Sequence, residues 1–131
     1  MNIEKILYKL SLKAKKNGDI PISCIIVKDN KIIAKAYNTK YKKNDPLGHA
    51  EINAIRKATK KLKTVNLKEC TLFVNLMPCE MCQNLIYESR IKKVYYYIEN
   101  KKKYNKNTEY IKINSVFDFS TEIRTFFNNK R

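Results

Sequence analysis

Glycine and proline are scarce in this chain. Its 131 residues include 2 glycines and 3 prolines, and no segment is rich in glycine, proline or serine. Linkers between domains usually have such a composition, so its absence argues against a second domain. A chain of this length also suffices for one hydrophobic core. We therefore expect a single domain over residues 1–131.

Long apolar segments are also absent. The uninterrupted apolar runs, such as residues 25–27, are only a few residues long, whereas a membrane-spanning helix needs roughly 20. The first residues carry charge throughout and lack the apolar block of a secretory signal. We therefore expect a cytoplasmic protein without membrane association. Because thiols are kept reduced in the cytoplasm, the 4 cysteines are better explained as metal ligands or buried thiols than as disulfides.

Acidic residues are outnumbered by basic ones. The chain has 28 Lys and Arg against 12 Asp and Glu, which gives a formal net charge of +16. Self-repulsion on that scale favours a polyanionic partner, and nucleic acid is the natural one. A compositional bias toward lysine explains the charge equally well, so charge alone decides nothing. The basic runs are dispersed over residues 13–16, 40–43, 57–63 and 101–106, and the last of them is a candidate for phosphate contacts.

The hydrophobic pattern alternates between helical and strand spacing. Apolar residues recur every three or four positions across residues 3–16, which predicts an amphipathic helix. Two apolar runs at residues 22–27 and 31–37, separated by Asp29 and Asn30, predict a tight β-hairpin. We expect the remaining helices at residues 49–62, 79–90 and about 121–128, and the remaining strands at residues 71–76, 94–98 and 110–113. This alternation predicts an α/β fold whose sheet is partly parallel and covered by helices.

One histidine and two cysteines stand where helices are expected to begin. His49 opens the second predicted helix, and Cys79 and Cys82 open the third, three positions apart and so on one helical face. Zinc prefers imidazole nitrogen and thiolate sulfur, and a catalytic site uses three protein ligands so that a fourth position stays open. A lone histidine is usually an ordinary surface or core residue. The combination nevertheless favours one metal site made of these three residues.

Glu51 follows His49 by two positions. We expect it to accept and return protons rather than to bind the metal, because a fourth protein ligand would exclude the reacting water. Side chains two apart on a regular helix point about 200° away from each other, so His49 has to precede the regular helix if both are to face one cavity. The alternative for Glu51 is a solvated first-turn acid stabilised by the helix dipole.

The two motifs, H-A-E at residues 49–51 and P-C-x-x-C at residues 78–82, resemble those of the zinc-dependent cytidine and deoxycytidylate deaminase superfamily. Within it, residues 19–22, 37–38, 45–46 and 89–91 are similar to bacterial tRNA-specific adenosine deaminases. The resemblance runs from about residue 20 to residue 98. The chain departs from the pattern at Met77, where the family usually has glutamate, at Ser23, and across residues 99–107.

The resemblance implies a fold, a reaction and a set of contacts. It implies a three-layer α/β/α sandwich around a mixed central sheet of about five strands, so that residues 1–131 form one deaminase domain. The implied enzyme is a zinc-dependent hydrolase, a homodimer with one Zn2+ per subunit, that converts the wobble adenosine of a tRNA anticodon stem-loop to inosine. Asn38 would hydrogen-bond the extruded base, and Ile20 and Pro78 are further candidate substrate contacts.

Two alternatives stay open at this point. The first is a deaminase of a free base, nucleoside or nucleotide, such as cytidine, deoxycytidylate or guanine, which would share the metal site and differ in the pocket walls. The basic charge favours RNA over this alternative, because a phosphate backbone rewards lysine and arginine through counterion release. The second is a non-catalytic, zinc-stabilised RNA-binding domain, for which Glu51 would have no purpose.

Overall fold

The computed structural model of the chain describes residues 2–99 and 107–129. Its helices are α1 (Ile3–Lys16), α2 (Ala50–Leu62), α3 (Glu80–Glu88) and α4 (Phe119–Asn129). Its strands are β1 (Ser23–Lys28), β2 (Lys31–Tyr37), β3 (Thr71–Leu76), β4 (Lys93–Ile98) and β5 (Glu109–Lys112). The basic run at residues 101–106, a candidate for phosphate contacts, lies outside the described residues.

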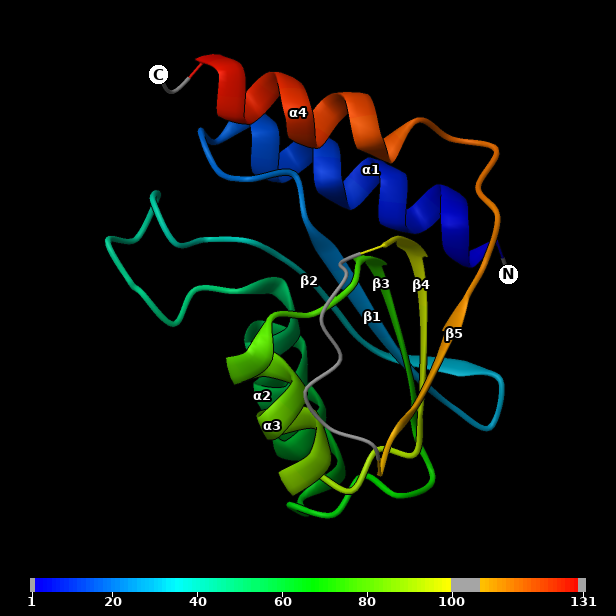
Figure 1. Ribbon diagram of the computed structural model, residues 1–131. Helices are drawn as coiled ribbons and strands as arrows, with labels where there is room; N and C mark the ends of the chain where they lie inside the picture. The colour runs from blue at the N-terminus through cyan, green and yellow to red at the C-terminus, as the bar shows by residue number, and fades with distance from the viewer. Residues whose placement is uncertain (1, 100–106, 130–131) are drawn as a thin grey trace.

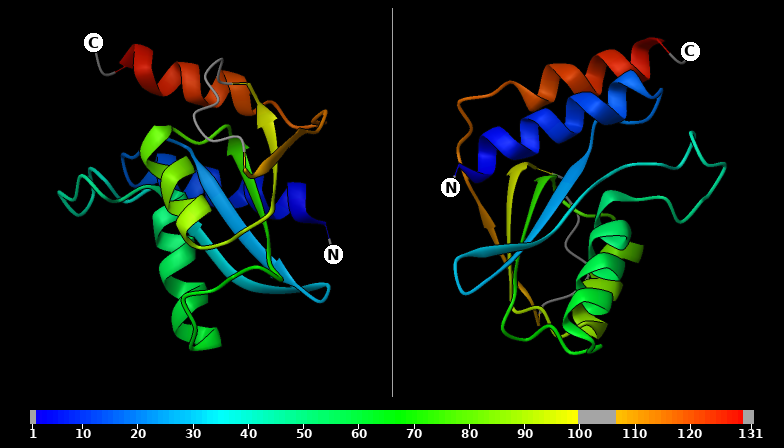
Figure 2. Two further views of the ribbon diagram at one scale, coloured as in Figure 1. Left: turned by 60° about the horizontal axis from the view of Figure 1, so that its bottom comes forward. Right: turned by 180° about the vertical axis from the view of Figure 1, so that it is seen from behind.

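The strands form one mixed sheet in the order β2-β1-β3-β4-β5. β1 is antiparallel to both β2 and β3, whereas β3, β4 and β5 run parallel to one another. Helices α1 and α4 cover one face of this sheet, and α2 and α3 cover the other (Figure 1 and Figure 2). The expected three-layer α/β/α sandwich with a mixed five-stranded sheet is therefore confirmed.

Strand β1 is buried on both faces of the sheet. Cys24 and Ile26 belong to the core cluster beneath α2 and α3, which also contains Ala58 of α2. Ile25 lies between them in sequence and belongs to the second cluster, beneath α1, together with Leu7. Because successive side chains of a strand point to opposite faces, a strand covered by helices on both sides is a continuous apolar run. Burial of each large aliphatic side chain contributes roughly 1.5–3 kcal/mol to folding.

The hairpin between β1 and β2 has the tight turn that the sequence predicts. Asp29 has φ 51° and Asn30 has φ 60°, and Lys28 pairs with Lys31 across the turn. Two consecutive residues with positive φ are characteristic of a type I′ turn, whose twist matches that of the flanking strands. Asp and Asn tolerate this conformation better than most residues do.

Three helices begin or end elsewhere than the sequence predicts. α2 begins at Ala50, one residue after the expected start at His49. α3 was expected over residues 79–90, but Cys79 is its extended N-cap residue and Arg90 has φ 68°, which a right-handed helix cannot continue. α4 begins at Phe119, before the expected residue 121, because Asp118 accepts a hydrogen bond from the Thr121 backbone N–H at 2.9 Å and caps the first turn. None of the described helices has both the length and the apolar composition that crossing a bilayer requires.

Candidate active site

His49 stands immediately before α2, and this position determines where its ring points. It is the N-cap residue, with extended backbone angles of φ −81° and ψ 144°. Glu51 lies in the first turn of the helix. The departure of His49 from helical geometry allows both side chains to line one cavity, as the sequence argument requires.

Asn38 holds this helix start in place. Its Oδ1 accepts a hydrogen bond from the Ala50 backbone N–H at 2.8 Å, which satisfies one of the free donors at the N-terminus of α2. The side chain is buried, and it lines the same cavity as His49. Because Oδ1 is the acceptor in this bond, the Nδ2 group remains as the donor for anything that enters the cavity.

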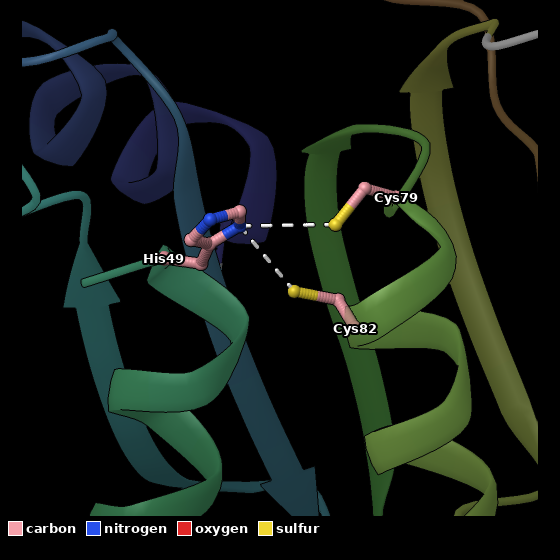
Figure 3. Close-up of side chains that lie close together, drawn as sticks. All are labelled: His49, Cys79 and Cys82. Atoms are coloured by element: carbon pink, nitrogen blue, oxygen red, sulfur yellow. Dashed lines mark hydrogen bonds between the residues drawn. The ribbon is translucent and has the colours of Figure 1, made fainter. Parts of the chain in front are cut away.

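Cys79 and Cys82 approach His49 from the facing helix. β3 ends at Leu76, the chain turns through Met77 and Pro78, and α3 then begins with Cys79 as its N-cap residue. His49 Nδ1 lies 3.8 Å from Cys79 Sγ and 3.6 Å from Cys82 Sγ, as Figure 3 shows. The structure thus brings together the three residues predicted to bind metal, with all ligand atoms within 4.8 Å of one another.

These distances fit a tetrahedral zinc site. With Zn–N near 2.05 Å and Zn–S near 2.3 Å, tetrahedral geometry places a nitrogen and a sulfur ligand about 3.6 Å apart. The two measured N···S separations are 3.8 and 3.6 Å. One imidazole and two thiol groups are also the donor set that zinc prefers. No other group of three such side chains is close enough to bind a metal within the described residues.

The electrostatics of the three candidate ligands favour a thiolate at Cys79. Hydrogen bonds from Cys82 and His49 lower the pKa of Cys79 to about 4. The hydrogen bond to Cys79 raises the pKa of His49, because the protonated ring is paired with the negative sulfur. The hydrogen bond to Cys79 and burial together raise the pKa of Cys82. A cation at this position would favour the ionised form of both sulfurs.

Glu51 is almost completely removed from solvent. Its side chain has a relative exposure of 4%. Burial raises the pKa of Glu51 to about 7, and the neighbouring Cys79 charge acts in the same direction. Its own backbone N–H and the charge of His49 oppose this rise. A carboxyl group with a pKa near neutrality can both accept and donate a proton under physiological conditions.

The cavity beside these groups has a volume of about 130 Å³. Ile20 and Asn38, which were expected to contact substrate, both line it. Pro78 is buried and is not among the lining residues, and its carbonyl oxygen accepts a hydrogen bond from Gln83 Nε2 at 2.9 Å. Substrate contact through Pro78 therefore stays a prediction. Sequence reasoning missed Lys40, which also lines the cavity.

The other two cysteines lie apart from the candidate metal ligands. Cys24 and Cys70 are both buried members of the core cluster beneath α2 and α3, and neither forms a disulfide. Burial raises the pKa of each thiol, which favours the neutral form. Small buried thiols of this kind are packing residues.

Comparison with known proteins agrees with this geometry. The model of the MafB19-like deaminase family matches residues 2–131. The chain belongs to this family. The chain is 40% identical over 98 residues to the tRNA-specific adenosine deaminase of Aquifex aeolicus (strain VF5), a match that covers 75% of the chain and 65% of that relative. The resemblance to tRNA-specific adenosine deaminases is thus confirmed.

The fold is shared with solved structures, among them two that cover most of this chain. One comes from a study of A-to-I editing by tRNA:A34 deaminases at the wobble position of transfer RNA; it has a TM-score of 0.77 at 25% identity and covers 83% of this chain and 95% of its own. The other is the guanine deaminase of Bacillus subtilis, with a TM-score of 0.69 at 31% identity and coverage of 98% and 95%. The chain spans 65%, 60% and 51% of the first three curated relatives that it matches.

Proposed function

We propose that this chain is a zinc-dependent hydrolytic deaminase that converts the wobble adenosine of a tRNA anticodon loop to inosine. The observation that carries the proposal is the convergence of His49, Cys79 and Cys82 beside a buried carboxyl group, Glu51, at a cavity of about 130 Å³. The similarity to tRNA-specific adenosine deaminases supports adenosine as the base. The family match over residues 2–131 supports one deaminase domain spanning the chain.

The roles follow from the position of each group. His49, Cys79 and Cys82 would hold the zinc ion, which, when bound, lowers the pKa of water at its open position to about 7. Glu51 faces the same cavity and would take a proton from the attacking water and deliver it to the ring nitrogen. The water oxygen forms a bond to C6 of adenine as the ring nitrogen N1 takes the first proton. Glu51 then moves the second proton from the new hydroxyl group to the exocyclic amine, so that the C6 carbonyl forms, the bond from C6 to the exocyclic nitrogen breaks and ammonia leaves.

The walls of the cavity suit a flat ring. Ile20, Ile22 and Met77 supply apolar surface, and Asn38 supplies a hydrogen-bond donor. Such a pocket holds a base by stacking against aliphatic groups and fixes its orientation through one polar contact. The base has to leave its stack before it can enter, which costs least in a loop that is already single-stranded. An anticodon loop meets this condition, and a tRNA substrate would place the enzyme in the cytoplasm.

We also infer that the active form is a homodimer. An apolar hollow of about 290 Å³ lies over α2 and α3, where Leu47 is 42% exposed and Met81 is 39% exposed. Ile52 and Ile55 of α2 and Leu85 of α3 complete its apolar lining. Exposed apolar surface of this kind usually marks a contact with another protein. Sedimentation equilibrium should give twice the mass of the chain, and a monomer at assay concentrations would exclude the dimer.

A second candidate is a guanine deaminase acting on the free base. The solved structure of the Bacillus subtilis guanine deaminase covers nearly all of this chain at 31% identity, which favours this alternative. Its zinc chemistry would be the same, and only the cavity walls would differ. A free base offers no phosphate to the excess of lysine and arginine, whereas an RNA backbone does.

The decisive experiment offers both substrate classes to the purified, zinc-loaded protein. Anticodon stem-loops carrying adenosine or cytidine at the wobble position are compared with free adenosine, cytidine and guanine, and the products are read by mass. We expect inosine from the adenosine stem-loop, with uridine from the cytidine stem-loop at background. Faster turnover of free guanine than of the stem-loop would overturn the proposal in favour of the second candidate.

A further inference from the structure

A larger cavity lies on the other side of the chain segment that borders the candidate active site. Its volume is about 450 Å³, and it is bounded by the end of β2, the segment that follows, and α2. Five of its lining residues are cationic: Lys42, Lys43, Arg56, Lys57 and Lys60. No carboxylate is among the lining residues. We call this cavity the basic pocket.

Within the part of the chain that the structure describes, no carboxylate forms an ion pair with a cation of the basic pocket. Ion pairs among the described residues join Lys15 to Glu122 and Lys28 to Glu69, and none involves a cation of the pocket. Lys57 does form a hydrogen bond, although not with an acid: its Nζ donates to the Lys35 carbonyl oxygen at 2.8 Å. Like charges within a Debye length of about 8–10 Å repel one another, so an anion in the pocket would relieve this repulsion.

The segment that carries Lys42 and Lys43 is held in a fixed position. The buried Asp19 carboxylate accepts hydrogen bonds from the backbone N–H groups of Tyr41 at 2.8 Å and Lys42 at 3.0 Å. On the side of α2, Asn53 Nδ2 donates to the Tyr37 carbonyl oxygen and to Thr39 Oγ1, both at 3.0 Å. These contacts keep the lysines of the segment beside the cations of α2. Figure 1 shows this segment between β2 and α2, projecting away from the sheet.

The basic pocket and the active-site cavity share this segment of chain. Tyr37 and Thr39 line the basic pocket, whereas Asn38 and Lys40 line the cavity that contains His49. The alternation follows from extended backbone, in which successive side chains point to opposite sides. Consecutive residues of one segment therefore line the two cavities, which lie on opposite sides of it. A ligand that reaches both must be longer than a single base.

We propose that the basic pocket binds the sugar–phosphate backbone of the RNA whose base enters the active-site cavity. The inference rests on the proposed function and extends it, because it assigns a second subsite to the same substrate. A polynucleotide carries one negative charge per nucleotide, so the backbone beside an extruded base reaches the pocket with phosphates. Phosphate contacts of this kind position a nucleic acid without reading its sequence. The pocket therefore selects RNA over a free base.

The test removes three of the five cations without disturbing neighbouring structure. Lys57 is left intact because it bonds to the Lys35 carbonyl, and Arg56 is left intact because it also borders the apolar hollow proposed for dimer contact. The variant is K42Q/K43Q/K60Q. The control, K5Q/K9Q/K112Q, loses the same charge from exposed lysines on α1 and on β5, the sheet edge opposite β2. A third variant, K42R/K43R/K60R, restores the charge.

Binding of a fluorescent anticodon stem-loop is followed by anisotropy over a range of salt concentrations, with zinc content and melting temperature measured for every variant. We expect K42Q/K43Q/K60Q to raise Kd by more than about tenfold near 0.15 M salt, and to lower the slope of log Kd against log salt by about 2. The control should stay close to the wild type, and the arginine variant should bind like it.

Equal changes in Kd and slope for the pocket variant and the control would overturn the inference, because the RNA would then be bound by diffuse charge. Failure of the arginine variant to restore binding would overturn it too. The proposed function is judged separately, by inosine formation in the wild type. RNA that binds through the pocket without forming inosine would reject the proposed reaction and keep the binding site.

Discussion

Asn75 of β3 is fully buried, and its side-chain amide bonds only to backbone groups from a distant part of the chain. Its Oδ1 accepts a hydrogen bond from the Ser23 N–H at 3.0 Å, and its Nδ2 donates to the Pro21 carbonyl oxygen at 2.8 Å. The intervening residue, Ile22, lines the active-site cavity. Asn75 therefore stabilises the fold and one cavity wall together.

Replacing Asn75 with Ala should be strongly destabilising. The change leaves a buried N–H and a buried C=O without partners, each at a cost of about 1–3 kcal/mol. We expect the free energy of unfolding to fall by about 2–4 kcal/mol, measured by urea denaturation of the zinc-loaded protein. N75D provides the comparison: it keeps the acceptor for Ser23, loses the donor to Pro21 and adds a buried carboxyl group, so it should also be destabilising. Stability of N75A within experimental error of the wild type would contradict this role.

At the scale of single residues, the sequence predicts what lies close together in the chain. His49 and Glu51 are two positions apart, and Cys79 and Cys82 are three apart, so the spacing within each motif determines its local geometry. The structure brings His49, Cys79 and Cys82 together and places Glu51 at the same cavity. Asn75 acts on residues 52 and 54 positions away. No local pattern encodes that pairing, because it depends on β1 and β3 becoming neighbours in the sheet.

At the scale of elements, the conformation of the segment between β2 and α2 depends on a close contact between the backbone at Gly48 and the backbone at residues 39–40. The Thr39 N–H donates to the Gly48 carbonyl oxygen at 2.9 Å. A Cβ atom at Gly48 would lie 2.6 Å from Lys40 N and 2.8 Å from Lys40 Cα. Since these are backbone atoms, they cannot move aside cheaply. Gly48 also directly precedes the metal-binding candidate His49.

The variant Gly48→Ala should therefore impair both stability and activity. We expect a loss of about 1–3 kcal/mol in stability from overpacking. Displacement of His49 should lower kcat/KM for the stem-loop by about tenfold to a hundredfold. G18A is the matched control: Gly18 has φ 81° and nothing within 4 Å of an added Cβ, so it should lose about 1–2 kcal/mol through strain alone. Equal kcat/KM values for the two variants would refute the structural role of Gly48.

The existence of each described element followed from hydrophobic spacing, whereas some of the boundaries did not. β2 and β3 have the predicted bounds. β2 is flanked by the polar residues Asn30 and Asn38, and β3 is followed within two residues by Pro78, which cannot donate a hydrogen bond to the sheet. α3 ends before the expected residue because Arg90 adopts a positive φ. Arginine has no preference for this conformation, so the residue type gives no signal for the helix end. The start of α4 depends on Asp118 acting as a cap, and the same residue type also occurs in ordinary loops.

At the scale of the whole molecule, the sheet brings the dispersed signals of the sequence into one region. The cysteine motif follows the carboxyl end of β3, and ligands in α/β folds bind beside such strand ends. The basic runs at residues 40–43 and 57–63 look unrelated in sequence, yet both contribute to the basic pocket. The number of charges was visible from composition, and their convergence required the packing of α2 against β2.

The central claim is that the metal-binding cluster serves a reaction whose protons pass through Glu51, and the variant Glu51→Gln tests it most directly. Ammonia release from the adenosine stem-loop is measured together with bound zinc, with E80Q as control because Glu80 is an exposed acid in the first turn of α3. E51Q should keep its zinc and lose ammonia release by about a hundredfold or more, while E80Q resembles the wild type. Undiminished ammonia release by E51Q, or loss of zinc together with the carboxylate, would contradict the account.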